Sequence, residues 1–163
     1  MSQSPLTSRR KTKPTAATVK KRESVFWRQA QKAMEKSTRA KSWTTTRIES
    51  WAVPGVPDLD VCDEFGRFHK IELKSTATDK VDLRPHQVAY ATRHQHASCW
   101  ILVRKGLTEG GHAVFLYHAR QAVDVWAEGC KVRPILRLDQ PIDWDVLWNT
   151  IAPLEDINAV ATA

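Results

Sequence analysis

The sequence predicts a single α/β domain in which helices flank a mixed β-sheet, and three observations lead to this prediction. The chain has 163 residues, of which 42% are apolar. That is enough for one packed core and short for two. Apolar residues recur at helical spacing near both ends of the chain. Between them, short β-branched runs alternate with turn residues, as the strands of one sheet do.

The N-terminal region combines a basic segment with an amphipathic one. Residues 1–22 carry seven Lys and Arg among Ser, Thr and Pro, with almost nothing to bury, so we expect a disordered arm. Such an arm either tethers DNA electrostatically or is a solvated tail. From Glu23 to Lys36, the spacing of Phe26, Ala30 and Met34 predicts an amphipathic helix.

The middle of the chain predicts strands around a tight hairpin. Thr44–Glu49 is β-branched and extended, and residues 53–57 form a loop rich in Pro and Gly. Leu59–Asp63 and Phe68–Ser75 are strand-like runs joined by Glu64-Phe65-Gly66. Since Gly can adopt the positive φ of a three-residue turn, the two runs should form an antiparallel hairpin.

The remaining elements complete the expected domain. Pro85 precedes a helical stretch at His86–His96, because proline suits the first turn of a helix. Strands are expected at 100–103 and 113–117, and further helices at 120–128 and 144–151. We therefore divide the chain into the arm at 1–22, a core at 23–118, and a helical extension at 119–163 packed on that core.

Charge and cysteine usage limit the functional classes. The formal net charge of +7 favours a polyanionic partner such as DNA, because Lys and Arg displace counterions from phosphates. Three widely separated cysteines argue against disulfides and structural zinc. No apolar run reaches membrane-spanning length, and the N-terminus does not resemble a secretory signal. We expect a cytoplasmic protein with no membrane partner.

The predicted hairpin brings charged residues together. If paired residue numbers sum to 130, Asp58 lies opposite Glu72 on the same face of the sheet. Opposed carboxylates share a proton or bind a cation. The strand period of two adds Lys74 to that face and directs Ile71 and Leu73 into the core. Hard oxygen ligands suit Mg²⁺ or Mn²⁺, so the pattern predicts a hydrolytic phosphodiesterase site.

These residues carry a family resemblance that covers about half of the chain. Gly55-Val56-Pro57-Asp58-Leu59, followed by Ile71-Glu72-Leu73-Lys74, resembles the signature of PD-(D/E)xK nucleases. Arg84-Pro85-His86-Gln87 and the strand Trp100-Ile101-Leu102-Val103 are similar to the VRR-NUC and Holliday-junction-resolvase branch, including small phage-type nucleases. The resemblance implies a restriction-endonuclease-like fold.

The resemblance also implies site residues. The metal site would involve Asp58, Glu72, Leu73 and an acidic residue of the first helix, which maps most naturally onto Glu23, with Glu35 as the fallback. A Glu in a first helical turn is, however, often only a partner of the helix dipole. The charged triplet of the hairpin could likewise be a surface ion-pair cluster.

Two further polar residues are candidates for the catalytic set. Glu49 precedes the catalytic loop, where resolvase-like relatives place polar residues near the scissile phosphate. Gln87 resembles the helix residue that supports the site or contacts the DNA backbone. The simpler explanations are an ion pair of Glu49 with a neighbouring arginine and an exposed first-turn position for Gln87.

The sequence thus predicts an Mg²⁺-dependent DNA endonuclease, selective by resemblance for branched or Holliday-junction DNA. Asp58, Glu72 and Glu23 would bind the metal, and Lys74 would assist the attacking water. Two alternatives stay open, namely an exonuclease or end-processing nuclease with the same site, and a non-catalytic DNA-binding protein. Junction cleavage would favour a homodimer. A phage-encoded enzyme would act in the host cytoplasm.

Overall fold

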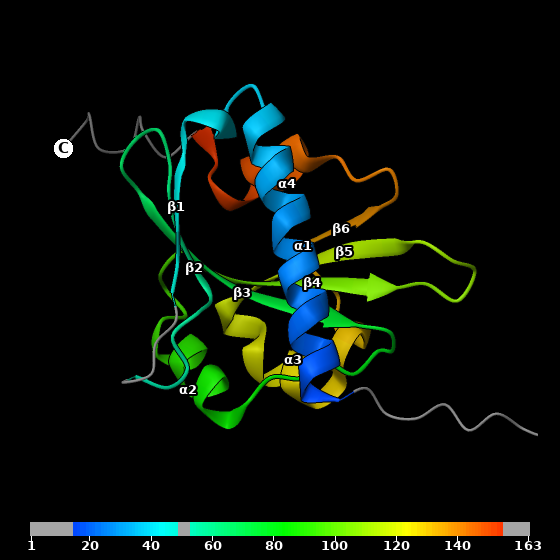
Figure 1. Ribbon diagram of the computed structural model, residues 1–163. Helices are drawn as coiled ribbons and strands as arrows, with labels where there is room; N and C mark the ends of the chain where they lie inside the picture. Colours follow the sequence, from blue (N-terminus) through cyan, green and yellow to red (C-terminus); the bar gives the residue numbers. More distant parts are fainter. Residues whose placement is uncertain (1–14, 49–52, 155–163) are drawn as a thin grey trace, which may run out of the picture.

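A computed structural model describes residues 15–48 and 53–154, and a six-stranded mixed sheet runs through these ranges. Its strands are β1 (Thr44–Arg47), β2 (Leu59–Cys62), β3 (Phe68–Thr76), β4 (Cys99–Gly106), β5 (His112–His118) and β6 (Leu136–Asp139), in that spatial order. β3 and β4 are parallel, and the other neighbouring pairs are antiparallel. The predicted single α/β domain is confirmed (Figure 1).

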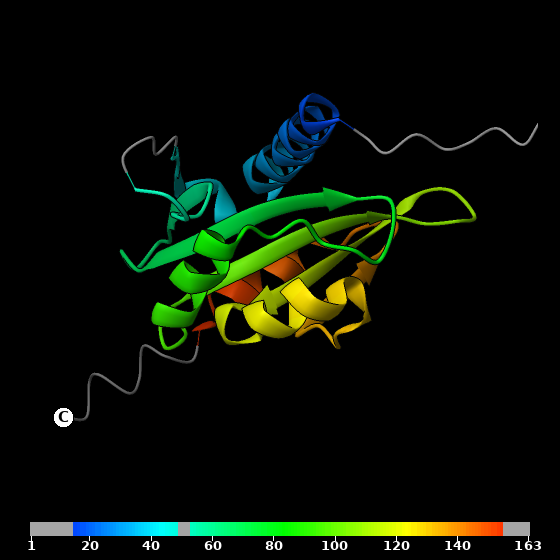
Figure 2. The ribbon, with the colours of Figure 1, turned by 90° about the horizontal axis from the view of Figure 1, so that it is seen from below.

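Helices cover both faces of this sheet. They are α1 (Ala16–Lys36), α2 (Pro85–Arg93), α3 (Ala122–Glu128) and α4 (Trp144–Ile151), with short 3₁₀ helices at Ala40–Ser42, Ala119–Gln121 and Gly129–Lys131. One buried cluster joins α1 and α4 to the sheet, and a second joins α2 and α3 to the opposite face. Figure 2 shows α1 on one side of the sheet and α2 and α3 on the other.

The first helix begins earlier than the sequence analysis predicted. Thr15 caps α1 through its hydroxyl oxygen, which accepts a hydrogen bond from the Thr18 backbone amide. Residues 16–22, predicted to belong to the disordered arm, are therefore helical. The prediction was wrong there because Ala, Lys and Arg are good helix formers and continue a helix whose later turns are buried. Residues 1–14 of the arm lie outside the described ranges.

This correction changes the position of Glu23. With 3.6 residues per turn, Glu23 lies beyond the second turn of α1 instead of at its start. The helix-dipole explanation applies only to the first turn. It therefore does not account for Glu23.

The hairpin has the predicted register. Leu59 pairs with Ile71 and Val61 with His69, so paired residue numbers sum to 130. Gly66 has a φ of +76° in the connecting turn, which favours glycine. Ile71 and Leu73 lie in the core beneath α1, as predicted from strand alternation.

In the rest of the chain, the structure differs from the prediction mainly in the C-terminal extension at 119–163. The range 144–151 predicted for a helix matches α4, and Pro85 is the first residue of α2. β6 was not predicted, because four residues give a weak strand signal. The extension is therefore not purely helical, since β6 pairs with β5 in the central sheet.

Two smaller expectations concern the cysteines and membrane-spanning helices. All three cysteines are free thiols, and Cys99 and Cys130 are buried. Within the described ranges, no helix combines the length and apolar character needed to span a bilayer.

Candidate active site

The site forms where the hairpin ladder ends. β2 stops pairing with β3 at Leu59, so residues 72–76 of β3 have a ladder partner only in β4 among the described strands. Asp58 lies at this open edge and its Oδ2 accepts a hydrogen bond from the Leu73 amide at 2.9 Å. The Asp58 carbonyl also accepts from the Ile48 amide at 2.8 Å. Asp58 is thus held at the end of the β2–β3 ladder by contacts with β3 and with the residue that follows β1.

Glu72 is the most enclosed acid of the site. Its residue surface is 4% exposed, and its Oε1 lies 2.9 Å from Lys74 Nζ and 2.5 Å from Gln87 Nε2. Burial raises the pKa of this carboxyl to about 8, against the opposing charge of Lys74 and with a further increase from Asp58 and Glu23. Glu72 therefore holds a proton more tightly than an ordinary carboxyl group does.

Lys74 supplies positive charge to the site. Its residue surface is 8% exposed. Burial acts to lower the pKa of its ammonium, but the ion pair and hydrogen bond with Glu72 outweigh burial, aided by Glu23 and Asp58, and the pKa is raised. Lys74 therefore remains charged at neutral pH.

The first turn of α2 orients Glu72 through Gln87. The Gln87 Oε1 accepts a hydrogen bond from the Arg84 backbone amide at 2.9 Å. The side-chain oxygen of Gln87 therefore faces the Arg84 backbone N–H. Its NH₂ group faces Glu72 and donates to that carboxyl. Gln87 therefore caps the first turn of α2 and also holds the Glu72 carboxyl in place, so a first-turn position alone does not account for its contacts.

Gly55 brings the loop that precedes Asp58 against the same helix. Its φ is +92°, and a Cβ at this position would lie 2.2 Å from the His86 carbonyl oxygen. Only glycine permits this backbone approach. The loop that leads to Asp58 is thus packed on the turn that carries Gln87.

Glu23 joins the site from the opposite side of the sheet. Burial raises the pKa of its carboxyl, Lys74 opposes this shift, and Asp58 adds to it. These mutual effects place Glu23 within electrostatic reach of both residues. Glu35 is exposed and lies twelve residues further along α1, about 18 Å away at the helical rise, so it is separate from this cluster.

The donor set fits a divalent cation in chemical type. Asp58, Glu72 and Glu23 provide three carboxyl groups around one ammonium, and hard oxygen donors are what Mg²⁺ prefers. In their present positions, no three His, Cys, Asp or Glu side chains of the described residues are arranged to hold an ion. Leu73 has a buried side chain and an amide bonded to Asp58, so it could contribute only its carbonyl oxygen.

Most of the site residues predicted from sequence come together. Asp58, Glu72, Lys74 and Gln87 are linked through direct contacts or through the Leu73 amide, and Glu23 interacts electrostatically. Glu49 lies outside the described residues.

Other residues that contribute to the site were not assigned a role from the sequence. Asp82 and Arg84 also act on the Glu23 carboxyl, and Gly55 packs the loop against α2. A glycine close before the Pro-Asp pair was the available signal for Gly55. Nothing in the sequence marked Asp82. Comparisons of this chain with protein-family models, curated proteins and solved structures found no match.

Proposed function

We propose that this protein is a metal-dependent nuclease that hydrolyses DNA phosphodiesters through a site of the PD-(D/E)xK type. The observation that carries the proposal is the buried Glu72 carboxyl, which is held by Lys74 and Gln87 beside two further acids. A buried carboxylate in excess of its positive partners is costly for a purely structural role. Clusters with such strongly shifted pKa values are typical of functional sites.

The proposed cofactor is Mg²⁺ or Mn²⁺. Asp58, Glu72, Glu23 and the Leu73 carbonyl are the groups that would hold the ion. When bound, such an ion lowers the pKa of a coordinated water and offsets charge on a phosphate. The role of Glu72 in holding the ion requires its deprotonation, for which the neighbouring ammonium of Lys74 provides electrostatic support.

The remaining chemistry belongs to the chain itself. Lys74, fixed by its ion pair with Glu72, has hydrogen-bond donors beyond those that Glu72 uses. It can orient an attacking water and stabilise negative charge that develops on the scissile phosphate. Gln87 keeps the Glu72 carboxylate in one orientation, which reduces the reorganisation needed during reaction.

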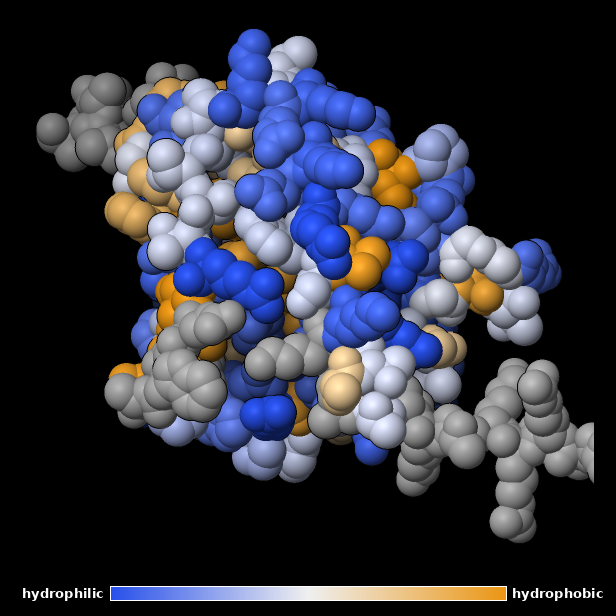
Figure 3. Space-filling model, viewed as in Figure 1, coloured by the Kyte–Doolittle hydropathy of each residue, from blue (hydrophilic) through white to orange (hydrophobic). Residues whose placement is uncertain are grey.

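DNA is the proposed substrate because of the charge of the chain. The net charge of +7 favours a polyanion, and hydrophilic side chains dominate the surface over α1 (Figure 3). We extend the proposal to branched or junction DNA, a homodimer and a cytoplasmic location, on the resemblance of the motifs alone.

Cleavage assays test this function. Labelled four-way junction, matched linear duplex and closed circular DNA are incubated with Mg²⁺ or EDTA, with the wild type and Glu72→Ala. Cleavage of the junction that requires both Mg²⁺ and Glu72 supports a resolvase, whereas equal cleavage of duplex indicates a general nuclease. Cleavage of linear DNA alone, with the circle intact, indicates an exonuclease. DNA binding without cleavage of any substrate would contradict the enzymatic proposal.

A further inference from the structure

A second charged cluster lies on the α1 face of the sheet, next to the candidate active site. Arg104 of β4 pairs with Ser75 on β3 and with Val114 on β5. Directly opposed residues share a face of a sheet, and Val114 belongs to the core beneath α1. The Arg104 side chain therefore emerges on the side that α1 covers.

Two basic residues are in contact there, and a third, Arg22 of α1, is close enough to act on them electrostatically. Arg104 Nη2 lies 3.4 Å from His112 Nδ1 on β5. Burial lowers the pKa of the Arg104 guanidinium, and the charge of Arg22 on α1 lowers it further. Burial and Arg104 likewise lower the pKa of His112. The two guanidinium groups are cationic, whereas the lowered pKa of His112 favours its neutral ring, which accepts from Arg104 through Nδ1.

This cluster has no counterion within the described part of the chain. Arg104 Nε is buried without a hydrogen-bond partner. Arg39 also has a buried nitrogen without a hydrogen-bond partner, Nη2, but Arg39 and Arg67 each form an ion pair with an acid of the hairpin turn, which Arg104 lacks among the described residues. A partly buried guanidinium with an unsatisfied donor is destabilising. The arrangement is explained if an external anion completes it.

One member of the cluster, His112, lies in a groove between α1 and the segment that joins β6 to α4. His112 lines that groove together with Gln29 and Lys32 of α1. The acidic residues that line the groove lie toward α4. Asp143 caps that helix, and Asp145 accepts a hydrogen bond from Ser37. The end of the groove at His112 and Lys32 is therefore the part suited to negative charge.

The cluster is adjacent to the candidate active site on the side of Glu23, because Arg22 directly precedes Glu23 on α1. Ser75, the ladder partner of Arg104, directly follows Lys74 on β3, so Arg104 and Lys74 leave the sheet on opposite faces. Successive helix residues point in directions about 100° apart, so Arg22 and Glu23 can serve neighbouring positions on one ligand.

We propose that Arg22, Arg104 and His112 form a phosphate-binding site that holds a non-scissile phosphodiester of the DNA strand beside the catalytic groups. This inference rests on the proposed nuclease function and assigns part of the substrate path to it. Arginine suits this role because its planar, forked donors match phosphate oxygens. The Nε–H of Arg104 is unpaired but buried, so the Nη atoms are the donors placed for such a contact.

Binding of labelled oligonucleotides in EDTA tests the site without cleavage. Affinity is measured by fluorescence anisotropy over a range of salt concentrations for the wild type, Arg22→Gln, Arg104→Gln and the control Arg120→Gln. Arg120 is an exposed residue of the 3₁₀ helix at Ala119–Gln121, away from this cluster. Arg104→Gln and Arg22→Gln should each weaken binding about tenfold and reduce the salt slope by about one, whereas Arg120→Gln should leave both nearly unchanged.

A thermal-shift experiment with inorganic pyrophosphate keeps the two proposals distinguishable. Pyrophosphate should raise the Tm of the wild type and not that of Arg104→Gln. The variant without ligand should be at least as stable as the wild type, because it loses an unpaired cation. If the wild type cleaves DNA while Arg104→Gln and Arg120→Gln bind it equally well, the phosphate site is wrong and the nuclease function stands. A third outcome is that pyrophosphate binding depends on Arg104 but the wild type neither binds nor cleaves DNA. In that case the nuclease function is wrong, and the ligand of the phosphate site is a free phosphate compound instead of DNA.

Discussion

The two ends of the β2–β3 hairpin carry buried acids in opposite electrostatic situations. At the closed end, Asp63 is 5% exposed, yet its pKa falls to about 2. Burial opposes this shift, but hydrogen bonds from the Arg67 amide and guanidinium, His69 and the Phe65 amide outweigh it. At the open end, Glu72 is 4% exposed and its pKa rises to about 8, with burial as the largest cause. Both the cost of burial and the balance of partners separate the two acids.

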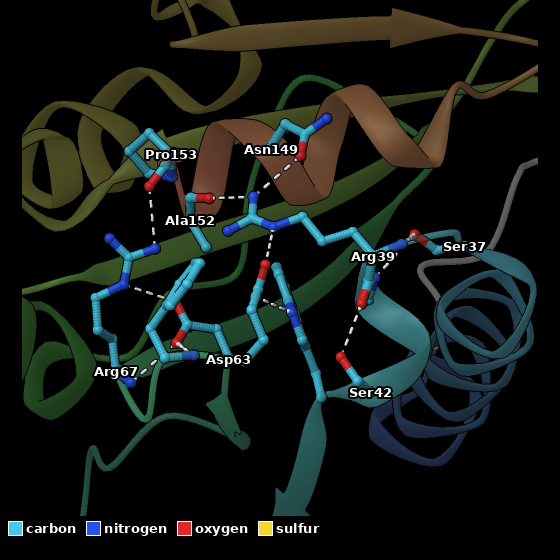
Figure 4. A network of polar contacts seen from close by, with 12 residues as sticks. Ser37, Arg39, Ser42, Asp63, Arg67, Asn149, Ala152 and Pro153 are labelled. Atoms are coloured by element: carbon cyan, nitrogen blue, oxygen red, sulfur yellow. Dashed lines mark hydrogen bonds and ion pairs between the residues drawn. The ribbon is translucent and has the colours of Figure 1, made fainter. Parts of the chain in front are cut away.

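The closed end of the hairpin connects the turn to the end of α4. Arg67 donates both to Asp63, at 2.7 Å, and to the Pro153 carbonyl, at 3.0 Å. Arg39 pairs with Glu64 and donates to Asn149 at 3.0 Å. Figure 4 shows these side chains linking the hairpin turn to the end of α4. The charges at this end are matched by partners within the chain, whereas the open end gathers three acids around one lysine.

Replacement of Glu72 should have the largest effect on activity. We expect Glu72→Gln to reduce metal-dependent DNA cleavage by about 10³-fold or more, because one charged ligand of the proposed ion is lost. The amide oxygen can still accept from Lys74 and Gln87, so the fold should remain. Cleavage rates and circular dichroism are the measurements. Asp63→Asn is the matched control and should cleave at a rate within a few-fold of the wild type where it is folded.

Replacement of Gln87 should have an intermediate effect. Gln87→Leu removes the donor that orients Glu72 and the acceptor for the Arg84 amide. Residues that orient a metal ligand typically contribute about 10- to 100-fold to activity or metal affinity. We expect a loss in that range, measured as kcat and as the Mn²⁺ concentration for half-maximal rate. An unchanged value of both would contradict the positioning role.

Replacement of Asp63 should act on stability. The lowered pKa of about 2 corresponds to roughly 2 kcal/mol of stabilisation relative to an ordinary Asp. Because the folded-state pKa is depressed, this contribution is present above pH 4 and is lost as the pH falls toward 2. Asp63→Asn should therefore lower the free energy of unfolding by about 2 kcal/mol at pH 7, measured by urea denaturation. A difference that persists unchanged at pH 2.5 would contradict this cause.

In the metal-free protein, replacement of Glu72 should have the opposite effect on stability to replacement of Asp63. Its folded-state pKa is raised, so the penalty for the charged form is absent below about pH 4.5 and grows as the pH rises through 8. Glu72→Gln should stabilise the metal-free protein by about 1 kcal/mol at pH 9 and less at pH 6. Urea midpoints in EDTA at the two pH values measure this trend. A stability gain that is larger at pH 6 would reverse the expected sign.

The hairpin could be predicted from the sequence better than the contacts of the charged side chains around it. The register followed from strand alternation and one turn glycine, which are local, so the grouping of Asp58 with Glu72 and Lys74 was predicted. The direct pairing of Asp58 with Glu72 was wrong, because the ladder ends at Leu59 and Ile71 and Asp58 accepts from the Leu73 amide instead. The start of α1 was missed because the basic segment has little apolar periodicity of its own. The contacts of Gln87 with Glu72 and of Arg104 with His112 depend on packing between separate elements, which no local pattern records.

Mn²⁺ binding at the open end of the hairpin tests the central claim most directly. Free Mn²⁺ is followed by electron paramagnetic resonance while the ion is titrated into the wild type, Asp63→Asn and Glu72→Gln at pH 7 and pH 8.5. The account predicts similar binding by the wild type and Asp63→Asn, tighter binding at the higher pH, and binding at least about tenfold weaker by Glu72→Gln. Equal binding by the wild type and Glu72→Gln, or no binding by the folded wild type, would contradict the assignment of Glu72 to a metal site.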